Sequence, residues 1–301
     1  MNANDILIVG AGTAGLTAAI YVQRAGRHAV LFEKGAPGGQ IVTANEIQNY
    51  PGYSSINGAD FAYKLYEQAT SLGAEFISSE VLRITPEKGA VTIQTASGTW
   101  TGKALIYAAG ASHRRLGLAN EEKLIGRGIS FCANCDGAFF KGKTVAVNGG
   151  GNTALDDALY LSRVAKEVYL IHRRKEYRAE QPLQKAVAET ANIHPILDTT
   201  ITELHEADGH LTSITLHNQL TQQESDLAVD GLFLAVGMKP ETALLKGIVD
   251  LNDAGYILAN EDTRTSVNNI FAAGDVRNKT VRQLTTAAAD GTAAAIAAVA
   301  L

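Results

Sequence analysis

The sequence has no excess of basic residues, since its 26 lysines and arginines stand against 31 aspartates and glutamates and give a formal net charge of −5. Nucleic acids and anionic membranes attract proteins with the opposite balance, so we expect neither as a partner. Only 2 of the 301 residues are cysteine and only 6 are proline. Two cysteines exclude a framework of structural disulfides, and so little proline argues against disordered linkers.

Long apolar runs are missing as well. The most apolar late stretch, residues 285–301, is short, rich in alanine and interrupted by Asp290, whereas a hydrocarbon core about 30 Å thick needs a longer run. The first residues, MNANDILIVGAG, carry neither the basic nor the apolar region of an export signal. We therefore expect a cytoplasmic protein that does not enter the membrane.

Apolar residues nevertheless make up 46 % of the chain, and glycine is abundant, with 29 residues. One order of elements occurs twice: an apolar strand, a glycine turn, a helix, a second strand, a hairpin and an apolar strand ending in glycine. In the first half these are residues 6–9, 10–15, 13–25, 29–32, 91–101 and 104–110, and in the second half 144–147, 149–151, 152–165, 168–171, 214–229 and 231–237. We predict an α/β fold with two Rossmann-like dinucleotide-binding domains, each with a parallel sheet and a β-meander.

The first glycine turn, GAGTAG at residues 10–15, follows a strand and opens a helix. Here Gly10 permits the tight turn, Gly12 lets a pyrophosphate approach the backbone, and Gly15 lets helix and strand pack closely. Glu33 ends the next strand, where its carboxylate can accept both hydrogen bonds of a ribose diol. The pattern predicts an NAD-type or FAD-type nucleotide, the alternative being a turn that serves packing only.

The second glycine turn is a G-x-G-x-x-A variant that precedes a basic segment. Its candidate cofactor-binding residues are Gly149, Gly151, Asn152, Thr153 and Ala154. The next strand ends without an acid, in His172, Arg173 and Arg174, with Arg178 one helical turn further. Arginine side chains match the geometry of a 2′-phosphate, so this half is predicted to bind NADP, although the start of a solvated basic helix is an alternative.

A strand that ends in Gly274 and Asp275 indicates which nucleotide, NAD or FAD, the first domain binds. An acid at that position can bind the ribityl chain of a flavin, which NAD lacks. The alanine-rich helix that starts near Leu284 would then direct its positive end toward the flavin ring, which gains negative charge on reduction. We expect FAD in the first domain, while an aspartate that only caps a turn is the alternative.

The only two cysteines, Cys132 and Cys135, form a C-x-x-C motif followed by Asp136. Zinc needs four ligands and no second such motif exists, so we expect no metal site. A disulfide across so short a loop adds little stability, which favours redox exchange over a structural role. Asp136 is a candidate proton donor and acceptor for the opening disulfide, unless it serves only the turn before Gly137.

The two predicted domains interleave along the chain. Residues 1–113 form the first part of the FAD-binding domain, residues 114–244 the inserted NADPH-binding domain with the cysteine pair, and residues 245–301 the rest of the FAD-binding domain. A nicotinamide and a disulfide cannot both occupy one flavin face. We therefore expect the second domain to rotate during turnover, about crossings near residues 113–117 and 238–244.

Several segments together resemble the low-molecular-weight, bacterial-type thioredoxin reductases. They are GAGTAG at 10–15, GGQ at 38–40, NYPG at 49–52, CANCDG at 132–137, GGGNTA at 149–154, HRRKEYR at 172–178, FAAGDV at 271–276 and the pair Arg282-Gln283. The resemblance implies a homodimeric flavoenzyme that passes electrons from NADPH through FAD and the cysteine pair to thioredoxin. Thr13, Ala109 and Asn134 depart from the residues usual in that family.

The resemblance also implies roles for single residues. Cys135 would be the sulfur next to the flavin, Cys132 the sulfur that attacks the thioredoxin disulfide, and Asp136 the acid–base group. The implied FAD contacts are Gly39, Gln40, Asn49, Gly274, Asp275, Arg282 and Gln283, and the implied NADPH contacts include Thr153, His172, Arg173, Arg174 and Arg178. Alternatives are a reductase of another small disulfide protein, a ferredoxin-linked flavin reductase of the same fold, a dithiol oxidase and a nucleotide-responsive binding protein without turnover.

Overall fold

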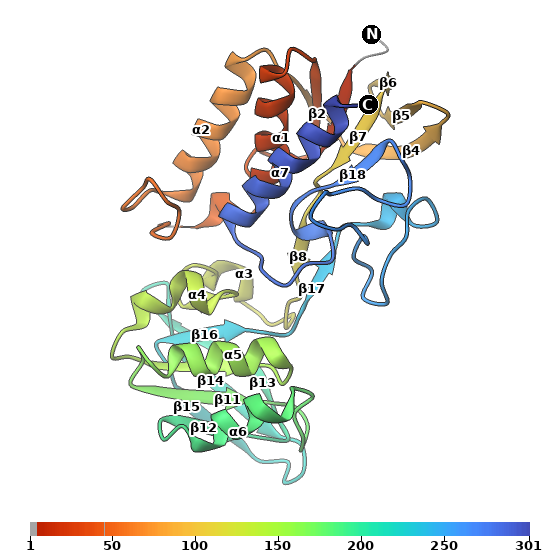
Figure 1. Ribbon diagram of the computed structural model, residues 1–301. Coiled ribbons are helices and arrows are strands. Elements are labelled where there is room, and N and C mark those ends of the chain that lie inside the picture. Colours follow the sequence, from red (N-terminus) through yellow and green to blue (C-terminus); the bar gives the residue numbers. More distant parts are fainter. Residues whose placement is uncertain (1–4, 45) are drawn as a thin grey trace. The chain divides into compact units, whose positions relative to one another are not determined.

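The computed structural model describes residues 5–44 and 46–301, so residues 1–4 and Asn45 of the expected FAD-binding domain lie outside the described part. The chain divides into two compact units (Figure 1). The first unit combines Met1–Ser112 with Lys239–Leu301, and the second is His113–Met238. The second unit is thus an insertion in the chain of the first.

A five-stranded parallel sheet forms the centre of the first unit, in the order β18-β7-β1-β2-β3. Its strands are β18 (Ile270–Ala272), β7 (Ala104–Tyr107), β1 (Ile6–Val9), β2 (Ala29–Glu33) and β3 (Glu75–Ser78). Alternate residues of a strand point to opposite faces. Accordingly Ile6 and Ile8 belong to one core, with residues of helices α1 (Thr13–Arg24) and α7 (Leu284–Val299).

The other face of this sheet is covered by an antiparallel meander, where Leu7 and Val9 pack in a second core with residues of its strands. The meander consists of β4 (Val81–Glu87), β5 (Ala90–Thr95) and β6 (Gly98–Gly102). The remaining elements of the unit are α2 (Gly58–Ser71), η1 (Gly39–Thr43), η3 (Ala243–Leu245) and η4 (Gly274–Val276).

The second unit repeats this plan. Its parallel sheet has the order β12-β11-β10-β16-β9, and its meander is β13-β14-β15. The strands are β12 (Ile193–Ile196), β11 (Glu167–Ile171), β10 (Thr144–Asn148), β16 (Gly231–Leu234), β9 (Ile129–Ser130), β13 (Thr199–Ala207), β14 (His210–Asn218) and β15 (Glu224–Ala228). The helices are α3 (Glu121–Leu124), α4 (Ala133–Asp136), η2 (Gly137–Phe140), α5 (Asn152–Leu161) and α6 (Gln181–Glu189). The predicted α/β fold, with a parallel sheet and a meander in each half, is confirmed.

The chain passes between the units at two segments, β8 (Ala111–His113) and β17 (Met238–Pro240), which pair with each other. The second passage lies at Met238, inside the crossing near residues 238–244 that the sequence suggested, and the inserted unit ends there and not at residue 244. Residues 239–244 stay with the first unit because the Tyr107 hydroxyl donates to the Glu241 carbonyl at 2.7 Å and Leu245 is fully buried in its core. No helix in the described ranges combines the length and apolar character needed to cross a bilayer.

Candidate active site

The first glycine turn connects β1 to α1 under tight steric limits. Gly10 has φ +99°, and a methyl group on it would lie 2.4 Å from the Ala108 carbonyl oxygen. A methyl group on Gly15 would lie 1.8 Å from the Gly10 carbonyl oxygen, so helix and turn meet at a distance that only glycine allows. Beside Gly12, by contrast, no described atom lies within 4 Å of such a methyl group. One side of the turn is therefore open to a ligand at the start of a helix.

Glu33 is tied to the same turn. Its carboxylate accepts the N–H of Ala11 at 2.9 Å and the N–H of Gly35 at 2.9 Å. The Gly38 N–H donates to the Ala11 carbonyl at 2.7 Å, which brings the GGQ segment to the turn. Gln40, on η1, donates from its side chain to the Ala111 carbonyl. Residues predicted from three separate sequence segments thus lie around one turn.

The segment after β18 carries polar groups that lack partners among the described residues. One buried oxygen of Asp275 and the Nε of Arg282 are in this state, while the Arg282 guanidinium lies 4.6 Å from the centre of the Tyr256 ring. Burial, reinforced by nearby Asp290, raises the pKa of Asp275, although Lys279 and Arg282 counteract the rise. Such groups fit the hydroxyl and ring polar atoms of a flavin.

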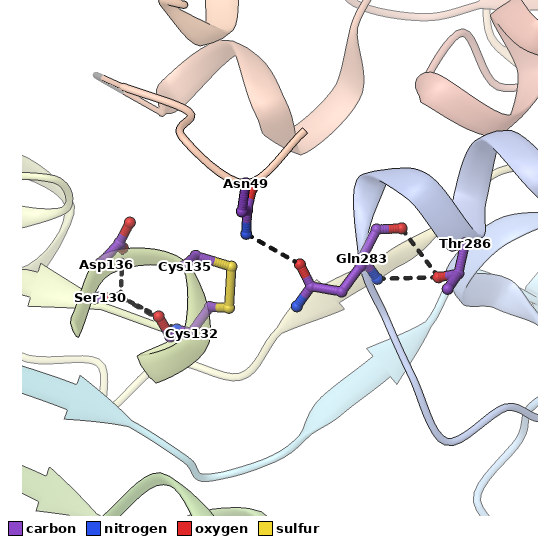
Figure 2. The surroundings of a disulfide bond; sticks show 7 residues. All are labelled: Asn49, Ser130, Cys132, Cys135, Asp136, Gln283 and Thr286. Carbon is purple, nitrogen blue, oxygen red and sulfur yellow. Dashed lines mark hydrogen bonds between the residues drawn. A yellow bond between two sulfur atoms is a disulfide. The ribbon is translucent and has the colours of Figure 1, made fainter. Parts of the chain in front are cut away.

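Figure 2 shows how Asn49 and Gln283 meet. The Asn49 side-chain amide donates to the Gln283 side-chain oxygen at 3.3 Å. Gln283 also forms a capping box with Thr286 at the start of α7, and its backbone N–H donates to the Thr286 hydroxyl at 3.1 Å. Two of the predicted FAD contacts are therefore joined at the N-terminus of α7.

Asp290 is a residue that the sequence analysis passed over as an interruption of an apolar run. It is buried on α7, and its carboxylate accepts the Gly274 N–H at 3.0 Å, the Arg277 Nε–H at 3.0 Å and the Lys279 ammonium at 2.9 Å. Asp290 thereby fixes the whole segment that presents Asp275. No sequence pattern links these positions, because the contacts join a helix interior to a loop.

We expect Asp290→Asn to lower the free energy of unfolding by about 3–5 kcal/mol and to reduce the FAD retained on purification. The substitution leaves buried Arg277 without a counter-charge, which costs more than an exposed pair would contribute. Urea unfolding and flavin absorbance measure both effects. Asp262→Asn is the control, because Asp262 pairs with Arg264 at 4.0 Å in an exposed position and should change the free energy by at most about 1 kcal/mol. Equal effects of the two variants would contradict this role of Asp290.

The second glycine turn, between β10 and α5, has the same design. A methyl group on Gly149 would lie 2.5 Å from the Ala235 carbonyl oxygen, whereas the space beside Gly151 is open within 4 Å. Asn152 is tied to Glu180, since its side-chain oxygen accepts the Glu180 N–H at 2.9 Å. The predicted residues Thr153 and Ala154 form the first turn of α5, with Thr153 exposed and Ala154 buried.

The basic segment after β11 returns to this turn. The Arg178 N–H donates to the Gly150 carbonyl at 2.7 Å, and the ring of His172 occupies the space that a side chain on Gly150 would need. Arg173, Arg174 and Arg178 are exposed. The expectation of a helical turn up to Arg178 is wrong, because the chain bends here and α6 begins only at Gln181.

His172 and Tyr177 complete the second site. Their rings stack with centres 5.6 Å apart, and the His172 Nε2 and the Tyr177 hydroxyl are buried without a hydrogen-bond partner among the described residues. Burial, together with the charges of Arg178, Arg173 and Arg174, lowers the pKa of His172 despite a bond to the Glu176 backbone. Tyr177 could not be selected from the sequence, since an aromatic residue in a basic run carries no pattern of its own.

Cys132 and Cys135 form a disulfide in the second unit (Figure 2). Cys132 precedes the short helix α4, which contains Cys135 and ends at Asp136. Ser130, a residue that the sequence analysis did not select, joins these parts. Its hydroxyl accepts the Cys132 N–H at 3.1 Å and donates to the Asp136 carboxylate at 2.6 Å. Burial raises the pKa of Asp136, and the bond from Ser130 partly offsets this rise.

The residues present fit two nucleotides and a redox disulfide. The first glycine turn is open beside Gly12 and the second beside Gly151. Each has unpartnered buried polar atoms nearby: those of Asp275 and Arg282 in the first unit, and of His172 and Tyr177 in the second. Within the described part of the chain, no three His, Cys, Asp or Glu side chains gather as metal ligands.

Comparisons with known proteins agree with this chemistry. A family model described as pyridine nucleotide-disulphide oxidoreductase matches residues 4–291. The chain is similar to a thioredoxin reductase of Bacillus subtilis, with 39 % identity over 97 % of this chain and 92 % of the relative. A solved thioredoxin reductase from Streptococcus pyogenes is 37 % identical, with a TM-score of 0.94 and coverage of 99 % and 98 %. Another from Lactococcus lactis, titled as the FR conformation, is 38 % identical, with a TM-score of 0.67 and coverage of 98 % and 97 %.

Proposed function

The chain belongs to the pyridine nucleotide-disulphide oxidoreductase family, and we propose that it is an NADPH-dependent thioredoxin reductase. The observation that carries this proposal is the disulfide between its only two cysteines, set in a turn whose neighbouring acid, Asp136, is partly buried and bonded to Ser130. Curated relatives that share about the whole chain carry the thioredoxin reductase name, which supports thioredoxin as the protein that is reduced.

FAD and NADPH are the cofactors of this reaction. We assign FAD to the first unit, on Gly10, Gly12, Gly15, Glu33, Gly39, Gln40, Asn49, Gly274, Asp275, Arg282 and Gln283. We assign NADPH to the second unit, on Gly149, Gly151, Asn152, Thr153, Ala154, His172, Arg173, Arg174 and Arg178. When bound, the two cofactors supply electron pairs, as a hydride from the nicotinamide and then as reducing equivalents from the flavin.

The cysteine pair converts these electrons into thiol chemistry. Two electrons and two protons turn the Cys132–Cys135 disulfide into two thiols. The Cys132 thiolate then attacks the disulfide of thioredoxin, forms a mixed disulfide and releases one thioredoxin thiolate. The Cys135 thiolate attacks the Cys132 sulfur, which restores the enzyme disulfide and releases the second thioredoxin thiolate.

Asp136 is placed to move the protons of this cycle. Its raised pKa increases the protonated fraction near neutral pH, and a protonated carboxyl group can donate to a departing thiolate. Ser130 joins the carboxylate to the Cys132 backbone N–H, so the acid stays next to the peptide group of the cysteine that exchanges. We therefore assign Asp136 as the acid–base group.

A rotation of the second unit relative to the first during turnover belongs to this proposal. Two solved relatives support it, because they resemble this chain equally in sequence, at 37 % and 38 % identity, but have TM-scores of 0.94 and 0.67. Nearly equal identity and coverage do not account for such a difference, whereas two arrangements of the same domains do.

We further propose a homodimer that works in the cytoplasm. Tyr21, Ile296 and Val299 line an apolar hollow on the first unit, the kind of surface that a subunit contact covers. A cysteine pair that must return to the dithiol form in each cycle suits a reducing compartment. Analytical ultracentrifugation of the purified protein tests the dimer.

NADPH oxidation by the purified yellow protein, measured with and without thioredoxin, tests the proposed function. We expect little oxidation alone, rapid oxidation with oxidised thioredoxin, and one thioredoxin dithiol formed for each NADPH consumed. Oxidation of NADPH that does not depend on a disulfide protein would indicate a flavin reductase instead. A colourless protein would contradict the proposal.

A further inference from the structure

Helix α5 packs against the redox turn, residues 132–136, which carries the two cysteines. Ala133, between the two cysteines, is fully buried and packs in one core with Ala158 and Leu161 of α5. A methyl group on Gly137, just after the turn, would lie 2.9 Å from the Tyr160 ring. The helix that starts at the second glycine turn is therefore also the platform of the disulfide.

One ionisable side chain of this platform is directed at the redox turn. The Ala133 N–H donates to the carboxyl group of Asp157, a partly buried residue in the second half of α5. The first N–H groups of a helix have no partner within the helix. Ser130 satisfies the N–H of Cys132, and Asp157 satisfies the next one, so two side chains hold consecutive peptide groups of the turn.

The environment of Asp157 disfavours its charge. Burial, followed by the neighbouring charge of Asp156, raises the pKa of Asp157 to about 7, although the bond from Ala133 works in the opposite direction. The titratable groups on the facing turn are Asp136 and, in the reduced enzyme, the thiols of Cys132 and Cys135. Asp157 is therefore protonated more readily than an exposed aspartate.

Resting on the proposed function, we infer that Asp157 is a positioning residue of the redox couple: it holds the turn between the cysteines and, when charged, opposes formation of the Cys132 thiolate. A negative charge beside a thiol favours the protonated thiol. Reduction of the disulfide by two electrons and two protons leaves a thiol at Cys132, the residue directly before the Ala133 N–H that this carboxyl group accepts. Asp157 thus sets how much of Cys132 is ready to attack a partner disulfide.

Asp157→Asn tests the charge with little change of shape. The holoenzyme is reduced with dithiothreitol, alkylated with iodoacetamide over a range of pH, and the alkylated cysteine is identified by mass spectrometry. We expect the midpoint for Cys132 to fall by about one pH unit, the lower end of the effect of a nearby charge. Asp157→Glu, which keeps the charge, should restore the wild-type midpoint.

Asp156→Asn is the matched control. Asp156 is adjacent, lies on the same helix and is exposed, so its substitution removes the same charge without touching the redox turn. We expect its alkylation midpoint to stay close to that of the wild type. Equal midpoints for wild type, Asp157→Asn and Asp156→Asn would overturn the inference.

Asp157→Ala tests the positioning. It leaves the buried Ala133 N–H without an acceptor, and we expect thioredoxin reduction to slow about tenfold while NADPH still bleaches the flavin. If this variant does not fold, the alkylation midpoint of Asp157→Asn decides whether the inference holds. A folded Asp157→Ala enzyme with wild-type turnover would also overturn the inference. The alkylation test needs neither NADPH nor thioredoxin. A wild-type enzyme that does not reduce thioredoxin would therefore contradict the proposed function without deciding the alkylation result.

Discussion

Cys132→Ser is expected to lower NADPH-dependent thioredoxin reduction by about a thousandfold or more, to the level of the uncatalysed reaction. A serine hydroxyl cannot form a disulfide and is not a nucleophile at neutral pH without a strong base. Both nucleotide sites lie on other residues, so NADPH should still bleach the flavin absorbance at the wild-type level. The bleaching shows that the variant is folded and loaded.

Cys135→Ser separates the roles of the two sulfurs. This variant keeps the attacking Cys132 but lacks the thiol that resolves the mixed disulfide. When Cys135→Ser enzyme is incubated with oxidised thioredoxin, Cys132 should attack the thioredoxin disulfide, release one thioredoxin thiolate and leave a covalent complex, seen by non-reducing electrophoresis. Complex formation by Cys132→Ser and not by Cys135→Ser would show that the assignment of the sulfurs is reversed. More than about a tenth of wild-type turnover in Cys132→Ser would contradict the mechanism.

The second large effect concerns the choice of coenzyme. Arg173→Ala combined with Arg174→Ala should reduce the preference for NADPH over NADH, taken as the ratio of kcat/KM values, by a hundredfold or more. Each charge-assisted bond to a 2′-phosphate contributes about 1.5–3 kcal/mol, and 1.4 kcal/mol corresponds to a factor of ten. Turnover with NADH should change little, because NADH carries no phosphate there.

Arg163→Ala combined with Lys166→Ala is the control for this change. Both residues are exposed in the same unit and follow α5 at the end away from the glycine turn. The control therefore removes the same two charges without altering the segment tied to Gly150. An unchanged preference in the Arg173/Arg174 variant, or an equal loss in the control, would show that the basic segment does not read the phosphate.

Most of the fold could be predicted from steric and periodic signals in the sequence. The apolar run of β1, the alternation in β5 and the two glycine turns depend only on residue type and spacing, so most strands of the sheets and their connections could be predicted. The strands β3 and β12 were missed, because they are short, lie at sheet edges and have exposed positions that blur their pattern. The first strand of each meander was missed for a related reason, since β4 and β13 carry irregular register.

The candidate site was predictable where a motif records the chemistry, as at Cys132 and Cys135. It was not predictable where a single polar residue acts through a tertiary contact. Asp157 and Asp290 each accept a backbone N–H of another element, and Ser130 links the Cys132 N–H to the Asp136 carboxylate. Nothing in the local sequence distinguishes these three from ordinary polar residues. The exact end of the inserted unit within the predicted crossing 238–244 belongs to the same class, because packing of Leu245 decides it.

The insertion of one unit into the chain of the other has a consequence for synthesis on the ribosome. Until β18 and α7 emerge, β7 is an unpaired edge of a four-stranded sheet, and the apolar side of α1 that α7 covers is bare. The inserted unit is one continuous segment and can fold before the C-terminal part of the first unit has been synthesised. Truncation before residue 270 should therefore yield an aggregating nascent protein in which only the inserted unit resists protease.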